Sequence, residues 1–430
     1  MTDAPDSNLP DNLPDAARRV ADAVRLDRVQ ARLDALAQIG GTPDGGVDRP
    51  AFSDAEREVT ALFAGWCAEL GLTVTYDDFG NLFASSDGNA AGGVTHAAGS
   101  HLDSVPNGGR YDGALGCVAA LETVEAMGDA VFAPVAPFEI VVWRAEEPYR
   151  FAQGRVGSLI CAGSLTVDDL VPRDPTFDVR PYLAAEARET RATRPRRAAG
   201  RGFASLLELH IEQGRRLEAS GGHIGVVTAV SSTRRLCLTF TGVADHSGAT
   251  PMELRRDALL AAAEVALATE RVAQEEPLAE SVATAVAISA TPGAMNVVPG
   301  GAELLLDIRS TDPDAISRMA VKIGGVAQDM TEGRGVAVGV ETLMRGDPVR
   351  FDAAVVAEIE ATARALGYTA ERMASGAGHD TQSMAHLTRA GMLFVPSRGG
   401  ISHNPAEYTA PDEIERGVRT LAAVWARRVL

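Results

Sequence analysis

Five short segments of the sequence place a histidine or a carboxylate at the end of an apolar run or beside glycines. Together they supply three imidazoles and two carboxylates, and no thiolate: His101, Asp112, Glu147, His210 and His403. This ligand set suits one or two divalent ions, such as Zn²⁺ or Mn²⁺, in a hydrolytic site. A carboxylate that bridges two ions would give the usual arrangement of a two-metal hydrolase.

The adjacent carboxylates Glu146 and Glu147 follow the apolar run 138–143. Such a pair repels unless a cation or a proton compensates, so one can bind a metal while the other acts as general base on water. Asp103 lies two residues after His101 and, in an extended segment, could hold that imidazole in one tautomer. Each motif alone also fits a structural role, for example Asp112 as a helix cap. Their coincidence favours a metal site.

The elements that must position these residues alternate between strands and helices. Strands are expected at 72–76, 82–84, 94–100, 138–143, 206–211 and 392–395, and helices at 16–39, 53–70, 114–127, 352–366 and 411–430. Ser53 is the expected N-cap of the second helix, with Glu56 at the capping-box position. The alternation predicts an α/β domain with helices on both faces of a mostly parallel sheet.

A different pattern begins near residue 229. Strands are expected at 236–241, 282–288, 301–309 and 336–342, with helices at about 254–274 and 314–330. This β-α-β-β-α-β order is that of a ferredoxin-like α+β sandwich. The sequence therefore predicts a disordered acidic lead-in over 1–15, a discontinuous catalytic domain over 16–228 and 346–430, and an inserted domain over 229–345.

Composition narrows the possible partners and the cellular compartment. The 430 residues carry a formal net charge of −18, which disfavours nucleic acid and anionic membranes as partners. The four cysteines are scattered and form no metal-binding pair, so we expect a cytoplasmic protein with reduced thiols. The arginine-rich stretch from Arg188 to Arg201 is interpreted as a solvated loop.

Six spaced motifs resemble the hydantoinase/carbamoylase amidase family, relatives of the di-metal aminopeptidases. They are the segments 99–104, 107–113, 146–147, 210–214, 375–380 and 402–407. The resemblance runs from about Ala16 to the C-terminus. It implies a di-metal aminopeptidase-like catalytic domain, and it implies that the inserted domain is a hinged lid through which the protein forms a homodimer.

The resemblance also implies a role for each matching residue. His101, Asp112 and His210 would hold one of two divalent ions, and Asp112 (bridging), Glu147 and His403 the other. Glu146 would be the general base and Asp103 the partner of His101. Substrate contacts would come from Gln213 and Ala377 and from three residues of the inserted domain, His246, Asn296 and Arg309. His246 would reach across the dimer and stabilise the oxyanion in the partner's active site. Of the other histidines, His96, His223 and His386 are expected to be structural, and His379 is left open between the two roles.

The expected activity is hydrolysis of the ureido C–N bond of an N-carbamoyl-L-amino acid or β-ureidopropionate, a small ureido carboxylate. The alternatives are an allantoate amidohydrolase, a dipeptidase or aminoacylase, and a catalytically silent dimeric binding protein. One departure from the family pattern concerns Pro148 and Tyr149, which stand where the family has glycine and a small residue. They put the identity of the substrate in question, although the hydrolytic chemistry should survive.

Overall fold

The computed structural model describes residues 13–86, 95–186, 203–278 and 280–430, and the chain divides into two compact units. Unit 1 comprises Met1–Thr228 and Arg350–Leu430, and unit 2 comprises Ala229–Val349. Most of the expected acidic lead-in (residues 1–12) and the stretch from Arg188 to Arg201 lie outside the described residues. Among the described helices, none is long and apolar enough to cross a membrane.

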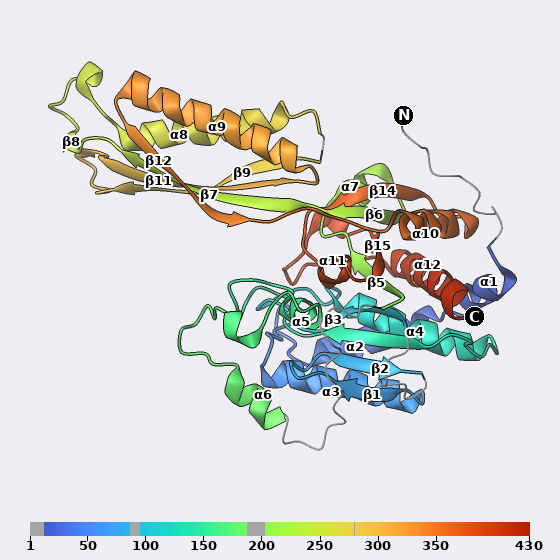
Figure 1. Ribbon diagram of the computed structural model, residues 1–430. Coiled ribbons are helices and arrows are strands. Elements are labelled where there is room, and N and C mark those ends of the chain that lie inside the picture. Colours follow the sequence, from blue (N-terminus) through green and yellow to red (C-terminus); the bar gives the residue numbers. More distant parts are fainter. Residues whose placement is uncertain (1–12, 87–94, 187–202, 279) are drawn as a thin grey trace. The chain divides into compact units, whose positions relative to one another are not determined.

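Unit 1 is built on a nine-stranded sheet in the order β1-β2-β4-β3-β5-β15-β6-β13, with β14 beside β6. Figure 1 labels most of these strands. The pairings of β4 with β3, β3 with β5, and β5 with β15 are parallel. The pairings of β1 with β2, β2 with β4, and β15 with β6 are antiparallel. The sheet is thus parallel at its centre and antiparallel toward its edges. Its strands are β1 (Thr73–Tyr76), β2 (Leu82–Ser85), β3 (His96–His101), β4 (Phe138–Trp143), β5 (Ser205–Ile211), β6 (Ile224–Val230), β13 (Val349–Arg350), β14 (Ala370–Ser375) and β15 (Arg389–Val395).

Helices cover both faces of this sheet, as the alternation of side chains along β4 shows. Phe138 packs edge-on against Trp425 of α12, with ring centroids 5.6 Å apart. Val141 points to the opposite face because it lies three residues further along the strand. There it joins a buried cluster with Met384 of α11. The helices of unit 1 are α1 (Asp15–Asp22), α2 (Leu26–Gln38), α3 (Asp54–Glu69), α4 (Ala114–Asp129), α5 (Val156–Cys161), α6 (Arg180–Glu186), α7 (Arg216–Ser220), α10 (Ala353–Ala365), α11 (Asp380–Met384) and α12 (Pro411–Val429).

Two local expectations at the N-terminal helices are wrong. The periodic segment 16–39 forms two helices, because the backbone leaves helical geometry at Arg25 and its amide donates to Glu122 Oε1 at 2.8 Å. Ser53 caps α3 as expected, accepting from the amide of Glu56 at 3.1 Å. The Glu56 carboxylate, however, accepts from the backbone amide of Phe52 and from Arg144 instead of closing a capping box.

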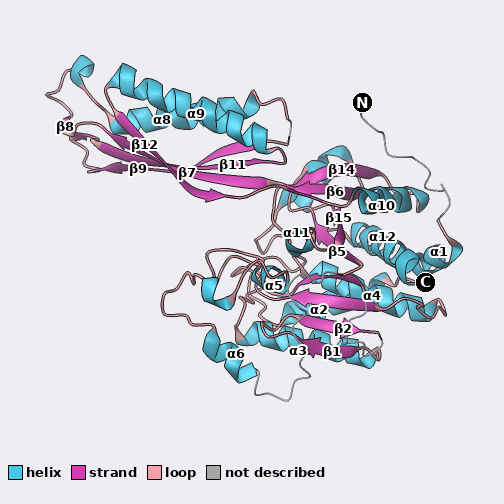
Figure 2. Cartoon of the chain, viewed as in Figure 1, coloured by secondary structure: helices cyan, strands magenta, loops and turns pink. Residues whose placement is uncertain are grey.

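Unit 2 is a four-stranded antiparallel sheet in the order β12-β7-β11-β9, with α8 and α9 along one face (Figure 2). Alternate residues of β7 and β11, including Leu238, Phe240 and Leu304, form its core with the apolar sides of the helices. This is the β-α-β-β-α-β arrangement of a ferredoxin-like sandwich. Its elements are β7 (Ser232–Thr241), α8 (Ala258–Gln274), β9 (Val282–Thr291), β11 (Gly301–Ser310), α9 (Pro313–Arg334) and β12 (Ala337–Arg345), with a small two-stranded sheet of β8 (Asp245–His246) and β10 (Val297–Val298).

Candidate metal-binding active site

Three neighbouring parallel strands deliver the candidate ligands to one edge of the unit 1 sheet. His101 is the last residue of β3, and His210 is the penultimate residue of β5. The segment that carries Glu146 and Glu147 begins directly after β4. Since the carboxyl ends of parallel strands meet at one edge, residues far apart in the sequence converge there.

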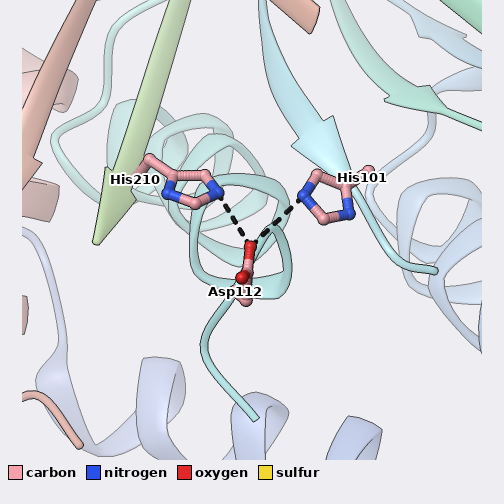
Figure 3. A group of neighbouring side chains, drawn as sticks. All are labelled: His101, Asp112 and His210. Atoms are coloured by element: carbon pink, nitrogen blue, oxygen red, sulfur yellow. Dashed lines mark ion pairs between the residues drawn. The ribbon is translucent and has the colours of Figure 1, made fainter. Parts of the chain in front are cut away.

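Asp112 lies at the centre of this convergence (Figure 3). Its Oδ1 atom is 3.5 Å from His101 Nε2 and 3.1 Å from His210 Nε2. Gly113, the N-cap of α4, has a φ of 64°, and a Cβ atom there would come within 2.5 Å of the His101 ring. Only glycine therefore allows this helix start to approach the imidazole so closely.

A second group of ligands shares Asp112. His403 Nε2 lies 3.3 Å from Asp112 Oδ2 and 3.3 Å from Glu147 Oε1. In each of the groups His101–Asp112–His210 and Asp112–Glu147–His403, the candidate ligand atoms lie within 4.8 Å of one another. Two sets of nitrogen and oxygen donors with one carboxylate in common fit a pair of divalent cations.

The electrostatics of the candidate ligands also favour binding of cations. Burial raises the pKa of Glu147 to about 7, and the charge of Asp112 adds to the shift. The bond to Asp112 raises the pKa of His403 to about 9. Burial favours the neutral form of Asp112, but hydrogen bonds from His101, His210 and His403 outweigh it and hold the pKa of this carboxyl well below its usual range. These groups therefore favour positive charge around Asp112, which divalent cations would also supply.

Asp103 orients the segment that carries the paired glutamates. Its carboxylate accepts from the backbone amide of Glu146 at 3.2 Å and from that of Glu147 at 3.1 Å. His101 Nδ1 bonds to the Asp103 backbone oxygen at 2.9 Å, whereas the nearest carboxylate oxygen is 3.8 Å away. The prediction that the Asp103 side chain fixes the imidazole is therefore corrected: the carbonyl group of Asp103 does so, and its carboxylate holds the glutamates.

Glu146 is buried beside the candidate metal ligands. Its burial raises the pKa of the carboxyl well above its usual range, against the effect of His101, and the charge of Asp380 adds to the rise. A carboxylate whose pKa is raised is a stronger base toward water than an ordinary glutamate.

Two residues to which no role was assigned from the sequence support Asp112. Glu407 Oε1 accepts from the backbone amides of Tyr111 and Asp112 at 2.9 and 3.1 Å. Glu407 Oε2 accepts from the hydroxyl of Ser402 at 3.0 Å, and Ser402 also lies 3.2 Å from Asp112 Oδ2. Their position in the 402–407 motif was the available signal, but the contact with Asp112 spans 295 residues.

The remaining candidates in unit 1 lie around the same ligands. Gln213, expected at the substrate, donates from Nε2 to Asp112 Oδ2 at 2.8 Å. The amide of Ala377 donates to Ser375 Oγ at 3.2 Å, and Ser375 bonds to His379 Nε2 at 3.0 Å. The buried His379 ring packs edge-on against His210 with centroids 4.6 Å apart, and burial lowers the pKa of His379 well below its usual value.

Pro148 and Tyr149, the two residues that depart from the family pattern, directly follow the paired glutamates. The amide of Tyr149 donates to the carbonyl oxygen of Glu147 at 2.8 Å and closes a tight turn. The Tyr149 residue is 43% exposed, so its ring is not packed into the core of unit 1.

The other three predicted substrate residues belong to unit 2. His246 on β8 is exposed and pairs with Val297 of β10, the residue directly after Asn296. The amide of Ser247 donates to the carbonyl oxygen of Asn296 at 2.9 Å. Arg309 on β11 donates to both carboxylate oxygens of Asp307, at 2.8 and 3.2 Å. The roles of His246, Asn296 and Arg309 at the active site stay predictions.

Comparison with known proteins places this site in a family. Residues 97–427 match Peptidase family M20/M25/M40. An uncharacterized hydrolase of Haemophilus influenzae is 37% identical, with 94% of this chain and 98% of that protein covered. An N-carbamoyl-L-amino-acid amidohydrolase of Pseudomonas sp. is 34% identical, covering 93% and 97%. An allantoate amidohydrolase of Bacillus subtilis is 33% identical, covering 90% and 93%. The crystal structure of a hydantoinase/carbamoylase family amidase from Burkholderia multivorans superposes with a TM-score of 0.88 at 34% identity, covering 94% and 98%.

The fold and the paired ligand groups thus define a metal-dependent hydrolase of Peptidase family M20/M25/M40. Within that class the chain belongs to the hydantoinase/carbamoylase amidases, which act on carbon–nitrogen bonds other than peptide bonds.

Proposed function

We propose that this enzyme hydrolyses the ureido group of an N-carbamoyl-L-amino acid or of β-ureidopropionate. The overall reaction is R–NH–CO–NH₂ + H₂O → R–NH₂ + CO₂ + NH₃, in which both C–N bonds of the ureido carbon are broken. The observation that carries the proposal is the sharing of Asp112 by two ligand groups directly beside Glu146. The relatives named N-carbamoyl-L-amino-acid amidohydrolase supply the substrate class.

Each residue at the sheet edge then has a defined task. His101, Asp112 and His210 would hold one divalent ion, Zn²⁺ or Mn²⁺, and Asp112, Glu147 and His403 a second. When bound, these ions would polarise the ureido oxygen and lower the pKa of water. Glu146 accepts a proton from the attacking water and returns it to the departing nitrogen. The Asp103 carboxylate holds the backbone of Glu146 and Glu147 in place by accepting hydrogen bonds from their amides.

Unit 2 would complete the active site as a lid. Arg309 offers a planar fork of donors that suits the carboxylate of a ureido acid, and Asn296 lies beside the strand pair that carries His246. In a homodimer formed through unit 2, His246 would stabilise the developing oxyanion of the partner's active site. Gln213 and Ala377 would contact the substrate from unit 1.

Ammonia release from a substrate panel tests the proposal. The panel comprises N-carbamoyl-L-amino acids, β-ureidopropionate, allantoate and a dipeptide, each with Mn²⁺, Zn²⁺ or a chelator. Metal-dependent ammonia from a ureido acid supports the proposal, with amino acid and CO₂ as the accompanying products. Turnover of allantoate alone would favour the second candidate, which the Bacillus subtilis relative suggests. Silence across the panel, with metals bound, would contradict both.

A further inference from the structure

We propose that Arg144 is a positioning residue for Glu146 and Glu147, acting through a buried ion triad with Glu56 and Glu186. The inference rests on the proposed function, because it assigns to this triad the task of aiming the general base and a metal ligand. Arg144 follows β4 directly and precedes the glutamates by two and three residues.

Both terminal nitrogens of the Arg144 guanidinium bond to carboxylates of the triad. Arg144 Nη1 and Nη2 donate to the two oxygens of Glu186 at 2.7 and 2.9 Å, and Nη2 also donates to Glu56 Oε2 at 2.9 Å. The Arg144, Glu56 and Glu186 side chains are 4%, 6% and 9% exposed. Paired, planar hydrogen bonds that are shielded from water fix the direction of the side chain, and the carboxylates that accept them compensate its charge.

The surroundings are shaped to receive this guanidinium. Its central carbon lies 3.9 Å from the centre of the Phe52 ring, and the backbone oxygen of Phe79 accepts from Nη1 at 3.4 Å. Gly80 has a φ of 94°, and a Cβ atom there would come within 2.5 Å of Arg144 Nη1. The turn before β2 therefore needs glycine at this point to make room for the arginine.

The backbone at Arg144 connects the triad to the catalytic turn. Ala145 adopts a left-handed conformation with a φ of 58°, which an alanine keeps only where its surroundings impose it. The carbonyl oxygens of Arg144, Ala145 and Glu146 accept in order from the amides of Gly157, Val156 and Arg155, at 2.9, 2.9 and 2.6 Å. The Arg144 amide donates to Asn81 Oδ1 at 2.9 Å.

The turn is thus held at three places: by Asp103 at its amides, by the start of α5 at its carbonyls and by the triad at Arg144. A lysine at position 144 would keep the positive charge but lose the fork that reaches Glu56 and Glu186 together. The turn would then lose its anchor at the residue before the left-handed Ala145, and the two glutamates would be displaced. Small displacements of catalytic groups have large effects on rate.

The test compares Arg144→Lys with the matched control Arg28→Lys. Arg28 donates to both oxygens of the buried Glu122, at 2.6 and 2.7 Å, and Glu122 lies near the middle of α4. At saturating Mn²⁺ we expect Arg144→Lys to lower kcat for ammonia release about tenfold, with KM changed less than threefold. We also expect weaker Mn²⁺ binding, because Glu147 is a proposed ligand. Arg28→Lys should leave kcat and Mn²⁺ affinity within twofold of the wild-type values, even if it lowers thermal stability as much as Arg144→Lys does.

Wild-type kcat and Mn²⁺ affinity in Arg144→Lys would overturn the proposal, as would equal losses in Arg28→Lys. Should Arg144→Lys not fold, Glu186→Gln takes its place, since glutamine keeps the side-chain volume and removes one charge of the triad. Unchanged kcat and Mn²⁺ affinity in Glu186→Gln would also overturn the proposal. Mn²⁺ affinity requires no substrate, so it tests the positioning role even if the proposed reaction fails.

Discussion

The carboxylate of Glu407 accepts a hydrogen bond from the backbone amide of Asp112 at 3.1 Å, although 295 residues separate the two in the sequence. Gly109 makes this approach possible, because a Cβ atom there would lie 2.0 Å from the Glu407 carboxyl carbon. The backbone of Asp112, the candidate ligand that both groups share, is therefore fixed by a residue that is not itself a proposed ligand.

Removing the Glu407 carboxylate should weaken metal binding. In Glu407→Ala the amides of Tyr111 and Asp112 would lose their acceptor, at about 1–3 kcal/mol for each buried group left unpaired. We expect metal affinity to fall about 10- to 100-fold, as measured by competition with a chelator. Glu407→Gln, which keeps one oxygen acceptor, should retain most of the affinity.

Glu218→Ala is the control for this change. Glu218 also accepts from a backbone amide, that of Gly399, but its side chain is 39% exposed. Its removal should leave metal binding unchanged. Equal metal affinity in Glu407→Ala and Glu218→Ala would contradict the role assigned to Glu407.

Metal affinity should rise with pH between about 6 and 9. In the metal-free protein the pKa of His403 is raised to about 9 and that of Glu147 to about 7. Below these values the groups carry protons, which a cation must displace, so each released proton strengthens apparent binding about tenfold per pH unit. Titration calorimetry at several pH values measures the slope. An affinity that stays constant across this range would show that these groups do not bind the metal.

Substrate affinity should depend on Arg309. Arg309→Ala is expected to raise KM for ureido carboxylates about tenfold or more, because it removes charge-assisted hydrogen bonds, while metal content stays unchanged. Arg235→Ala is the matched control, since Arg235 contacts the same Asp307, at 3.2 Å, from the neighbouring strand β7. Loss of metal in Arg309→Ala, or an equal rise of KM in Arg235→Ala, would refute the assignment.

Local patterns predicted the elements that carry the ligands. The apolar run ending at Trp143 forms β4 with the expected bounds, and His101 ends β3. His101, Asp112, Glu147, His210 and His403 converge as the resemblance implied. The range of a strand and the residue at its end are properties of a short segment, which explains why the sequence reveals them.

Contacts between distant side chains were beyond the reach of the sequence. Glu56 fits a capping box by its spacing, but its carboxylate bonds to Arg144 and to the backbone amide of Phe52 instead of the amide of Ser53. In the same way, the bond from Arg25 to Glu122 divides a segment whose apolar period is continuous. Such partners depend on how helices pack, and helical periodicity carries no record of them.

The most direct test of the account is ammonia release by Glu146→Gln, measured with metal content on the same sample. The substitution keeps the backbone amide that donates to Asp103 and removes only the proton acceptor. We expect kcat to fall about 10²- to 10⁴-fold while two divalent ions per chain remain bound. Turnover close to that of the wild type in the metal-loaded variant would contradict the assignment of Glu146 as the general base, and with it the mechanism proposed for this site.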